Sequence, residues 1–255
     1  MNVVLRSCLL AIAGLALAAT LLTGTPGLAQ SPAPAFTPAQ ADEIRELVRD
    51  YIRNNPEIIV EALQAFDAKQ KAEQAAAQES AIRRRQNDLL RDPQSPSAGP
   101  AGADVTVVEF FDYRCPYCKQ VVGALGQLKR GDPKLRVIYK ELPILGPDSV
   151  IASRAALAAV YQGGYEKMHA ALMARRGTLD EEAVQAVAQE VGLDPTRLKV
   201  DMARPEVAAQ IERNRALARD LGIRGTPAFV IGERLVPGAI DLETMRGLVA
   251  QARQR

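Results

Sequence analysis

The sequence contains no tryptophan, a single histidine and three cysteines among its 255 residues, and only 4% of the residues are aromatic. This shortage of aromatic residues, together with abundant alanine, predicts much helix and a core of modest size. A net charge of +2 gives no indication of nucleic-acid binding. A phosphate-binding loop, a nucleotide-binding fingerprint and a Ser–His–Asp set are also lacking, so neither nucleotide-dependent nor serine-hydrolase chemistry is indicated.

The first 29 residues have the pattern of a cleaved signal peptide. Arg6 supplies a short basic start, residues 8–22 form an apolar run, and Gly27-Leu28-Ala29 is similar to a small-residue cleavage site. An uncleaved membrane anchor is the alternative, but the apolar run is short for a membrane span. We therefore expect an exported protein whose mature chain begins with a flexible leader, rich in proline and alanine, at residues 30–38.

Two cysteines remain after such a cleavage, because Cys8 is removed. Cys115 and Cys118 form one closely spaced pair, which is not a structural disulfide framework, so we expect both thiols to react. A zinc site needs about four ligands, and beyond this pair the mature chain offers only His169. We expect His169 to pack on its own helix, Tyr165–Ala174, rather than to act in catalysis. The sequence therefore predicts no resident metal ion and no cofactor.

The cysteine pair follows a predicted buried strand. Val105–Phe111 is β-branched and aromatic, as in a central strand, and residues 118–128 have the pattern of a helix. Cys115 thus lies at a helix N-terminus, where free N–H groups and the positive end of the dipole stabilise a thiolate. Because a thiolate attacks disulfides and a thiol does not, the pattern predicts a thiol–disulfide oxidoreductase with Cys115 and Cys118 as its catalytic residues.

Glu109 is the only charged residue in the predicted strand. A carboxylate buried without a partner is costly, so its pKa is expected to rise. A carboxyl with a raised pKa beneath the dithiol is suited to take the proton of Cys118 when it is ionised and to return that proton afterwards. The alternative is a structural Glu109 that is bonded to Lys140 or to a water molecule.

The residues next to the cysteines modify the chemistry. Pro116 restricts the loop, and Tyr117 places a ring and a hydroxyl beside Cys115. Since Tyr117 cannot become cationic, the sequence does not fix a strongly oxidising potential. Pro227 opens a later strand, and in a thioredoxin-like order of elements it is expected to be cis and to face the dithiol. The backbone of Thr226 would then be free to pair with an extended substrate segment.

Residues 39–91 are predicted to form a helical domain before the catalytic domain. Its apolar residues recur at helical spacing and form one stripe: Ile44, Leu47, Val48, Tyr51, Ile52, Ile59, Leu63 and Phe66. So short a segment cannot bury this stripe on itself, so either the catalytic domain or another copy of the chain must cover it. Residues 92–102 have the composition of a linker.

The catalytic domain is predicted to span residues 103–255 with a thioredoxin-like order of elements. A strand at Leu135–Glu141 follows the first helix, and helices occupy an insertion at about residues 149–221. A hairpin and a closing helix at residues 242–250 complete the domain. The fold class is therefore α/β, a thioredoxin-like fold with a helical insertion, preceded by an all-helical segment.

Three motifs carry a resemblance to a known family. They are Glu-Phe-Phe-Asp-Tyr-Arg-Cys-Pro-Tyr-Cys at residues 109–118, Lys-Glu-Leu-Pro-Ile-Leu-Gly at 140–146 and Gly-Thr-Pro-Ala-Phe at 225–229. Together they resemble the DsbA-like thioredoxin-fold proteins. The nearest branch is the ScsC-like, or suppressor-of-copper-sensitivity, group, because Asn55-Pro56-Glu57 and Ala62-Leu63 are similar to the helical domain that precedes the catalytic domain there.

The resemblance implies a periplasmic protein with Cys115 as the exposed nucleophile and Cys118 as the resolving thiol. It also implies that Glu109 is the buried acid and that Thr226-Pro227 is the cis-proline loop. The implied partners are protein or peptide substrates with thiols or disulfides and a membrane redox protein of the DsbB or DsbD type. Members of the branch include oligomers with isomerase activity and monomers without it, so the resemblance leaves open a homo-oligomer, a trimer formed through residues 39–91, and does not fix the reaction direction.

Three functions remain open from the sequence. The first is an oligomeric disulfide isomerase or reductase, and the second is a monomeric dithiol oxidase of the DsbA type. The third is a copper-binding or copper-tolerance protein that uses the same two thiolates. Tyr117 stands where the DsbA pattern has His, and Thr226 stands where DsbA itself has Val. Both departures count against a general strong oxidant.

Overall fold

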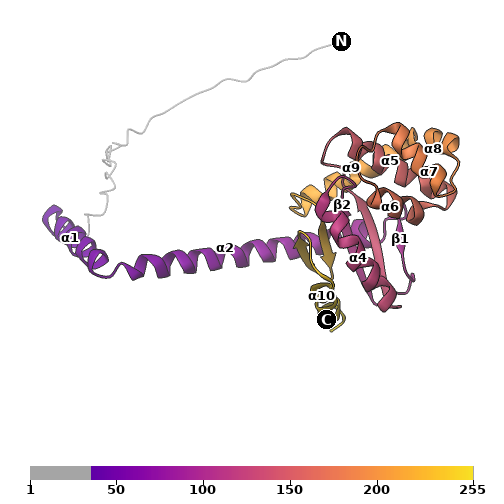
Figure 1. Ribbon diagram of the computed structural model, residues 1–255. Helices are drawn as coiled ribbons and strands as arrows, with labels where there is room; N and C mark the ends of the chain where they lie inside the picture. Colours follow the sequence, from indigo (N-terminus) through magenta and orange to yellow (C-terminus); the bar gives the residue numbers. More distant parts are fainter. Residues whose placement is uncertain (1–35, 255) are drawn as a thin grey trace, which may run out of the picture. The chain divides into compact units, whose positions relative to one another are not determined.

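The computed structural model describes residues 36–254, so the predicted signal peptide and residues 30–35 of the predicted leader lie outside the described part. The chain divides into two units between Ala62 and Leu63. Figure 1 labels the elements in chain order. Within residues 36–254, no helix is both long enough and apolar enough to cross a membrane.

Two helices, α1 (Pro38–Asn54) and α2 (Glu57–Arg84), form the N-terminal segment. α1 begins with a capping box in which the side chains of Thr37 and Gln40 each accept a hydrogen bond from the other residue's backbone N–H. It ends at Asn55, whose backbone N–H and side-chain amide both donate to the carbonyl of Tyr51. The prediction of a helical segment in this part of the chain is confirmed.

The apolar stripe of this segment is exposed. α1 contains no buried residue, and Leu47 is 71% exposed. The other large apolar residues of the stripe are exposed as well: Ile44, Val48, Tyr51, Ile52, Ile59, Leu63 and Phe66. These side chains are therefore available for contact with another molecule.

A mixed sheet forms the centre of the second unit, with strand order β1-β3-β2-β4-β5. Its strands are β1 (Ser97–Ala98), β2 (Val105–Phe111), β3 (Leu135–Glu141), β4 (Ala228–Ile231) and β5 (Arg234–Pro237). β2 and β3 are parallel neighbours, and the other pairs are antiparallel. The apolar composition of β2 is explained by its central position, since it is covered on both faces.

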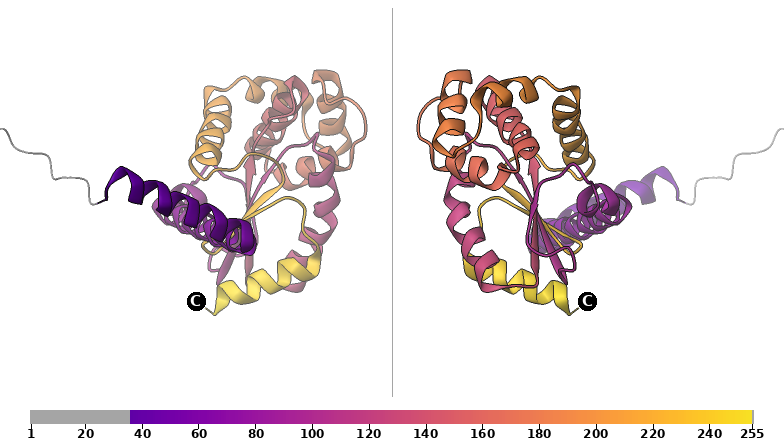
Figure 2. Two further views of the ribbon diagram at one scale, coloured as in Figure 1. Left: turned by 90° about the vertical axis from the view of Figure 1, so that its left-hand side faces the viewer. Right: turned by 90° about the vertical axis from the view of Figure 1, so that its right-hand side faces the viewer.

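Helices cover both faces of the sheet (Figures 1 and 2). One face, which carries Val107 and Phe111, packs against α4, α6 and α10. The opposite face, which carries Val108 and Phe110, packs against α3, α9 and the end of α2. The helices are α3 (Gln86–Leu90), α4 (Pro116–Gly131), α5 (Pro147–Ala159), α6 (Tyr165–Ala174), α7 (Glu181–Glu190), α8 (Pro195–Met202), α9 (Pro205–Asp220) and α10 (Leu242–Arg253), with a 3-10 turn at Val160–Gln162. The predicted thioredoxin-like fold with a helical insertion is confirmed.

Residues 92–102 differ from the free linker that their composition predicts. Ser97 and Ala98 form β1, an edge strand that pairs with β3. Gly99 makes the following turn with φ of +99°, and a Cβ there would lie 2.3 Å from the carbonyl oxygen of Leu135. The glycine and proline residues that suggest a linker therefore belong to tight turns that hold this segment on the catalytic domain.

Candidate active site

The two cysteines lie where β2 gives way to α4. Cys115 is the N-cap residue of α4, Pro116 occupies the first turn, and Cys118 follows inside the helix. Both are free thiols. Cys115 is only 4% exposed and Cys118 is fully buried. The exposed nucleophile that the resemblance implies is therefore corrected to a nearly buried one, because another loop lies against the Cys115 sulfur.

That loop contains Thr226 and Pro227, and the peptide bond between them is cis, as predicted. The Sγ of Cys115 donates to the carbonyl oxygen of Thr226 at 3.2 Å. The contact follows from the sheet: β4 begins directly after Pro227 and pairs with β2, with Ala228 opposite Phe110. Strand pairing thus brings residues that are 111 positions apart to one site.

The Cys118 thiol is a weak acid in its buried position. Burial raises the pKa of Cys118 well above its ordinary value, and the neighbouring Cys115 raises it further. The thiol therefore keeps its proton at neutral pH. Any step in which Cys118 attacks Cys115 needs a group that accepts this proton.

Glu109 lies on the face of β2 that also carries Phe111, and the hydrophobic cluster on that face includes both cysteines. The side chain is 1% exposed. Burial raises the pKa of Glu109 to about 8, and its Oε1 has no hydrogen-bond partner within residues 36–254. A neutral carboxyl with the predicted raised pKa is therefore present on the cysteine side of the sheet.

The alternative partner for Glu109, Lys140, lies on the other face. Lys140 is opposite Phe110 in the register, whereas Glu109 is opposite Tyr139. The Nζ of Lys140 instead donates to the carbonyl of Asp88 at 2.6 Å and to the Oγ of Ser95 at 2.7 Å. The predicted alternative of a Glu109–Lys140 bond is therefore wrong.

A cavity of about 310 Å³ adjoins Glu109 between α4 and α6. Tyr139 and His169 line it on the inside, and Lys129 and Glu166 form an ion pair of 2.8 Å among its outer lining residues. Glu166 is 60% exposed. Glu109 is therefore a buried lining residue of a cavity whose other lining residues include the exposed Glu166.

A second buried carboxyl, that of Glu141, was not identified from the sequence. Its Oε1 accepts hydrogen bonds from the hydroxyls of Tyr113 at 3.0 Å and Tyr165 at 2.9 Å. The Tyr113 hydroxyl also lies 3.0 Å from Nδ1 of His169. Burial raises the pKa of Glu141 to about 8 and lowers that of His169 to about 3. His169 is thus a neutral member of a buried cluster with Tyr113, Glu141 and Tyr165. These four residues lie too far apart in the sequence for a motif to indicate the cluster.

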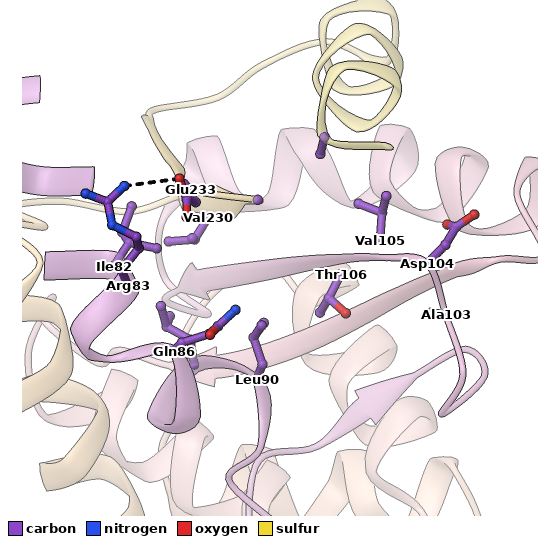
Figure 3. Close-up of a pocket in the computed structure, with 13 residues that line it drawn as sticks. Ile82, Arg83, Gln86, Leu90, Ala103, Asp104, Val105, Thr106, Val230 and Glu233 are labelled. Carbon is purple, nitrogen blue, oxygen red and sulfur yellow. Dashed lines mark hydrogen bonds and ion pairs between the residues drawn. The ribbon is translucent and has the colours of Figure 1, made fainter. Parts of the chain in front are cut away.

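Another cavity, of about 300 Å³, lies at the opposite end of β2 (Figure 3). Val105 and Thr106 line it at the start of the strand, together with Ile82 and Arg83 from the end of α2. Arg83 also forms an ion pair of 3.2 Å with Glu233 of the β4–β5 turn. The cysteines follow the other end of β2, so this cavity is separate from the dithiol site.

Comparison with known proteins identifies two domains. Residues 106–250 match the model of the DSBA-like thioredoxin domain, and residues 40–73 match that of the copper resistance protein ScsC N-terminal domain. The first match includes the dithiol, the cis-proline loop and the buried carboxyls of Glu109 and Glu141.

Solved structures agree with these matches. A thioredoxin-like oxidoreductase from Silicibacter pomeroyi is 47% identical, with a TM-score of 0.65, and the match covers 66% of this chain and 98% of that one. A linker-deletion variant of Proteus mirabilis ScsC is 32% identical, also with a TM-score of 0.65, over 87% of this chain and 98% of the other.

Curated relatives are matched over a shorter part of their length. The Na(+)/H(+) antiporter NhaA of Herminiimonas arsenicoxydans is 33% identical over 61% of this chain, which spans only 25% of that protein, about a quarter of its length. The thiol:disulfide interchange protein DsbA of Bordetella parapertussis is 28% identical over 58% of this chain and 72% of its own. From the site, the fold and these matches together, the chain belongs to the DsbA-like thioredoxin-domain family and carries an ScsC N-terminal domain ahead of its catalytic domain.

Proposed function

We propose that this thiol–disulfide oxidoreductase is a periplasmic disulfide isomerase or reductase that acts as a homotrimer. The observation that carries the proposal is the combination of a cysteine pair at a cis-proline loop with an exposed apolar stripe in the ScsC N-terminal domain. The first feature supplies thiol chemistry. The second supplies a surface through which several catalytic domains can be joined.

The reaction begins at Cys115. Its thiolate attacks one sulfur of a client disulfide, the client S–S bond breaks, and the departing client sulfur leaves as a thiolate that takes up a proton. The product is a mixed disulfide between Cys115 and the client. In isomerisation another client thiolate attacks this bond, forms a new client disulfide and returns the Cys115 thiolate, with no net transfer of electrons.

Reduction uses Cys118 instead. Its sulfur attacks Sγ of Cys115, which closes the Cys115–Cys118 disulfide and releases the client with two more electrons. The proton of Cys118 must leave first, and we assign its acceptance to the ionised form of Glu109, a buried carboxyl on the same side of the sheet. Because the pKa of Glu109 is raised to about 8, this form is the minority at neutral pH and increases as the pH rises. A membrane protein of the DsbD type would then return the two electrons to the pair.

The raised pKa of Cys118 slows resolution of the mixed disulfide by this thiol. A resolving thiol that holds its proton attacks slowly, since the thiolate is the nucleophile. The mixed disulfide therefore lasts longer, which gives a client thiol time to complete the rearrangement.

Repair of a protein with scrambled disulfides tests the proposal. Truncation at Asp104 would remove β1 along with the helical segment, so substitutions in the apolar stripe are the sharper tool. We expect the double variant Leu47→Lys, Leu63→Lys to lose at least about tenfold in repair rate, because separate catalytic domains lack the millimolar effective concentration of joined ones. Gln64→Lys with Gln70→Lys, on the exposed surface of α2, is the matched control and should repair at the wild-type rate.

Two outcomes would contradict the proposal. Equal repair by the stripe variant and the wild type would remove the need for an oligomer. Rapid oxidation of a dithiol peptide by both proteins, without repair by either, would instead establish a DsbA-type oxidase.

A further inference from the structure

Asp112 is a buried carboxylate that lies three residues before the nucleophilic cysteine. Its side chain is fully buried. Oδ1 accepts hydrogen bonds from the backbone N–H of Arg114 at 2.7 Å and from the hydroxyl of Ser149 at 2.8 Å. Oδ2 accepts from the backbone N–H groups of Ile144 at 2.8 Å and Leu145 at 3.0 Å. Four donors thus converge on one carboxylate, and its two oxygen atoms have enough lone pairs to accept from all of them.

The backbone of Asp112 contacts both cysteines. Its carbonyl oxygen accepts a hydrogen bond from the backbone N–H of Cys115 at 3.1 Å, which closes a β-turn over residues 112–115. An Asp at the first position of such a turn commonly accepts from the N–H two residues further on, as Asp112 does from Arg114. Burial raises the pKa of Cys118, and a hydrogen bond with the Asp112 backbone is the largest effect that opposes it. The turn therefore fixes the position of Cys115 and places a backbone group at the sulfur of Cys118.

The other donors tie this turn to the start of the helical insertion. β2 and β3 are parallel neighbours with Phe111 opposite Glu141, so the turn after β2 and the loop after β3 leave the sheet at the same edge. That loop supplies two of the four donors, and Ser149 of α5 supplies a third. The guanidinium of Arg114 adds a further link, because it donates to the carbonyl of Leu145 at 3.0 Å. The position of the cysteine turn is therefore set by residues that lie 32 or more positions further along the chain.

We propose that Asp112 is a positioning residue that sets how fast Cys118 resolves the mixed disulfide on Cys115. The inference rests on the proposed thiol–disulfide exchange and adds the residue that divides clients between reduction and isomerisation. In the resolving step the Cys118 thiolate attacks Sγ of Cys115, the S–S bond to the client breaks, and the client sulfur leaves as a thiolate that takes up a proton. The bond that forms joins Cys115 to Cys118, so the client gains the two electrons that the protein loses. A step within one molecule depends on the relative placement of its two sulfurs, whereas the first attack on a freely diffusing client depends on it far less.

Oxidised glutathione separates the two steps. It is mixed with the reduced mature protein, the reaction is quenched with acid at increasing times, and mass spectrometry measures the reduced protein, the mixed disulfide with glutathione and the internal disulfide. The attack gives a second-order rate constant, and the resolution gives a first-order one. We expect Asp112→Asn to resolve about tenfold more slowly than the wild type, with its attack constant within about twofold. Whichever way the amide is turned, its N–H₂ group would face at least one backbone N–H, so the turn would lose a hydrogen bond.

Ser149→Ala is the milder variant, since it removes one donor and leaves three backbone N–H groups on an intact carboxylate. It should resolve about threefold more slowly, in the range of one neutral hydrogen bond, and it tests the same link if Asp112→Asn does not fold. Asp194→Asn is the matched control. Asp194 also accepts from two backbone N–H groups, at the N-cap of α8, and Asn caps helices equally well, so both rate constants should equal those of the wild type.

Several outcomes would overturn the inference: an unchanged resolution constant in Asp112→Asn or in Ser149→Ala, a proportional fall of both rate constants in Asp112→Asn, or an equal loss in Asp194→Asn. A proportional fall would mean that Asp112 supports only the folded structure. Alkylation of Cys115 by iodoacetamide, measured in parallel, reports whether the thiol is reactive. If Cys115 is alkylated but the wild type does not react with oxidised glutathione, the proposed function itself fails and takes the inference with it.

Discussion

Glu109 and Glu141 are carboxyl groups on neighbouring strands, and both are shielded from water. They are 1% and 0% exposed, and burial raises the pKa of each to about 8. The Oε1 of Glu141 accepts from the hydroxyls of Tyr113 and Tyr165, whereas Glu109 Oε1 and Glu141 Oε2 have no partner in the described part of the chain. The fold therefore favours the neutral form of both carboxyls.

We expect Glu109→Gln to reduce the pH dependence of stability. The folded protein holds the Glu109 proton up to about pH 8, and the unfolded chain releases it near the ordinary pKa of 4.5. The stability from the neutral carboxyl is thus fully present below pH 4.5 and is lost as the pH rises towards 8, by up to about 1.4 kcal/mol per pH unit. Urea unfolding at several pH values in this window should show the variant becoming more stable relative to the wild type as the pH rises.

Glu166→Gln is the matched control for that experiment, since the Glu166 side chain is 60% exposed. It should follow the wild-type profile. Parallel profiles for the wild type and Glu109→Gln would show that the burial of Glu109 contributes nothing to the pH dependence.

The sequence predicts the burial of Glu109 but not its surroundings. Glu109 is the only charge in an apolar strand, so its burial follows from the strand itself. Whether Lys140 can bond to Glu109 depends on the register between β2 and β3. A shift of one residue would move Lys140 to the face of the sheet that carries Glu109. The four hydrogen bonds that the Asp112 side chain accepts could not be predicted from the sequence either, because their donors come from loops that only the folded sheet brings together.

Lys140 links β3 to the segment that precedes β2. Its Nζ lies 3.3 Å from Oδ2 of Asp92 and donates to Ser95. Burial lowers the pKa of Lys140, and Asp92 counteracts that effect. For Asp92, burial raises the pKa, but hydrogen bonds led by that from Gln210 outweigh it and bring the pKa to about 2. This charged cluster, and not apolar packing, anchors the residues that lead into β1.

We expect Lys140→Ala to destabilise the protein by about 3 kcal/mol, because it removes the buried Lys140 ammonium group and leaves the partly buried Asp92 carboxylate without its cation. Urea unfolding measures the loss. Hydrogen exchange at Ser97 and Ala98 should become faster than in the rest of the sheet, since β1 loses its anchor. Lys134→Ala, at an exposed residue before β3, should change stability by less than about 0.5 kcal/mol.

Equal losses of stability in Lys140→Ala and Lys134→Ala, or unchanged hydrogen exchange at β1, would contradict this account.

The longer elements could be predicted because β2, β3 and the helices show apolar patterns over many positions. β1 could not, since a strand of two residues has no period. Its charged anchor also depends on distant residues, because Lys140 lies 45 residues after Ser95 and 48 residues after Asp92.

The apolar stripe of the N-terminal segment consists of exposed side chains on α1 and α2. Leu47 and Tyr51 of α1 are 71% and 60% exposed, and Leu63 and Phe66 of α2 are 59% and 56% exposed. Contact between copies would remove this apolar area from water at about 25 cal/mol per Å². The sequence predicts the stripe from its spacing, but a single chain carries no information on how many copies share it.

We expect sedimentation equilibrium to give three times the monomer mass for the mature protein. Leu47→Lys with Leu63→Lys should give the monomer mass, because charged ammonium groups would have to be buried between copies. The control variant, Gln64→Lys with Gln70→Lys, should keep the wild-type mass. A monomeric wild type would remove the oligomer from the proposed function and leave the thiol chemistry as it is.

The hydroxyl of Tyr113 has one hydrogen but two neighbours. It donates that hydrogen to Glu141, so it can only accept from His169 Nδ1, 3.0 Å away. Above the Glu141 pKa of about 8, where this carboxylate can only accept, the neutral imidazole must then carry its hydrogen on Nδ1, which leaves Nε2 with the lone pair. A single tyrosine, two residues before the nucleophile, therefore selects the tautomer of the only histidine in the protein.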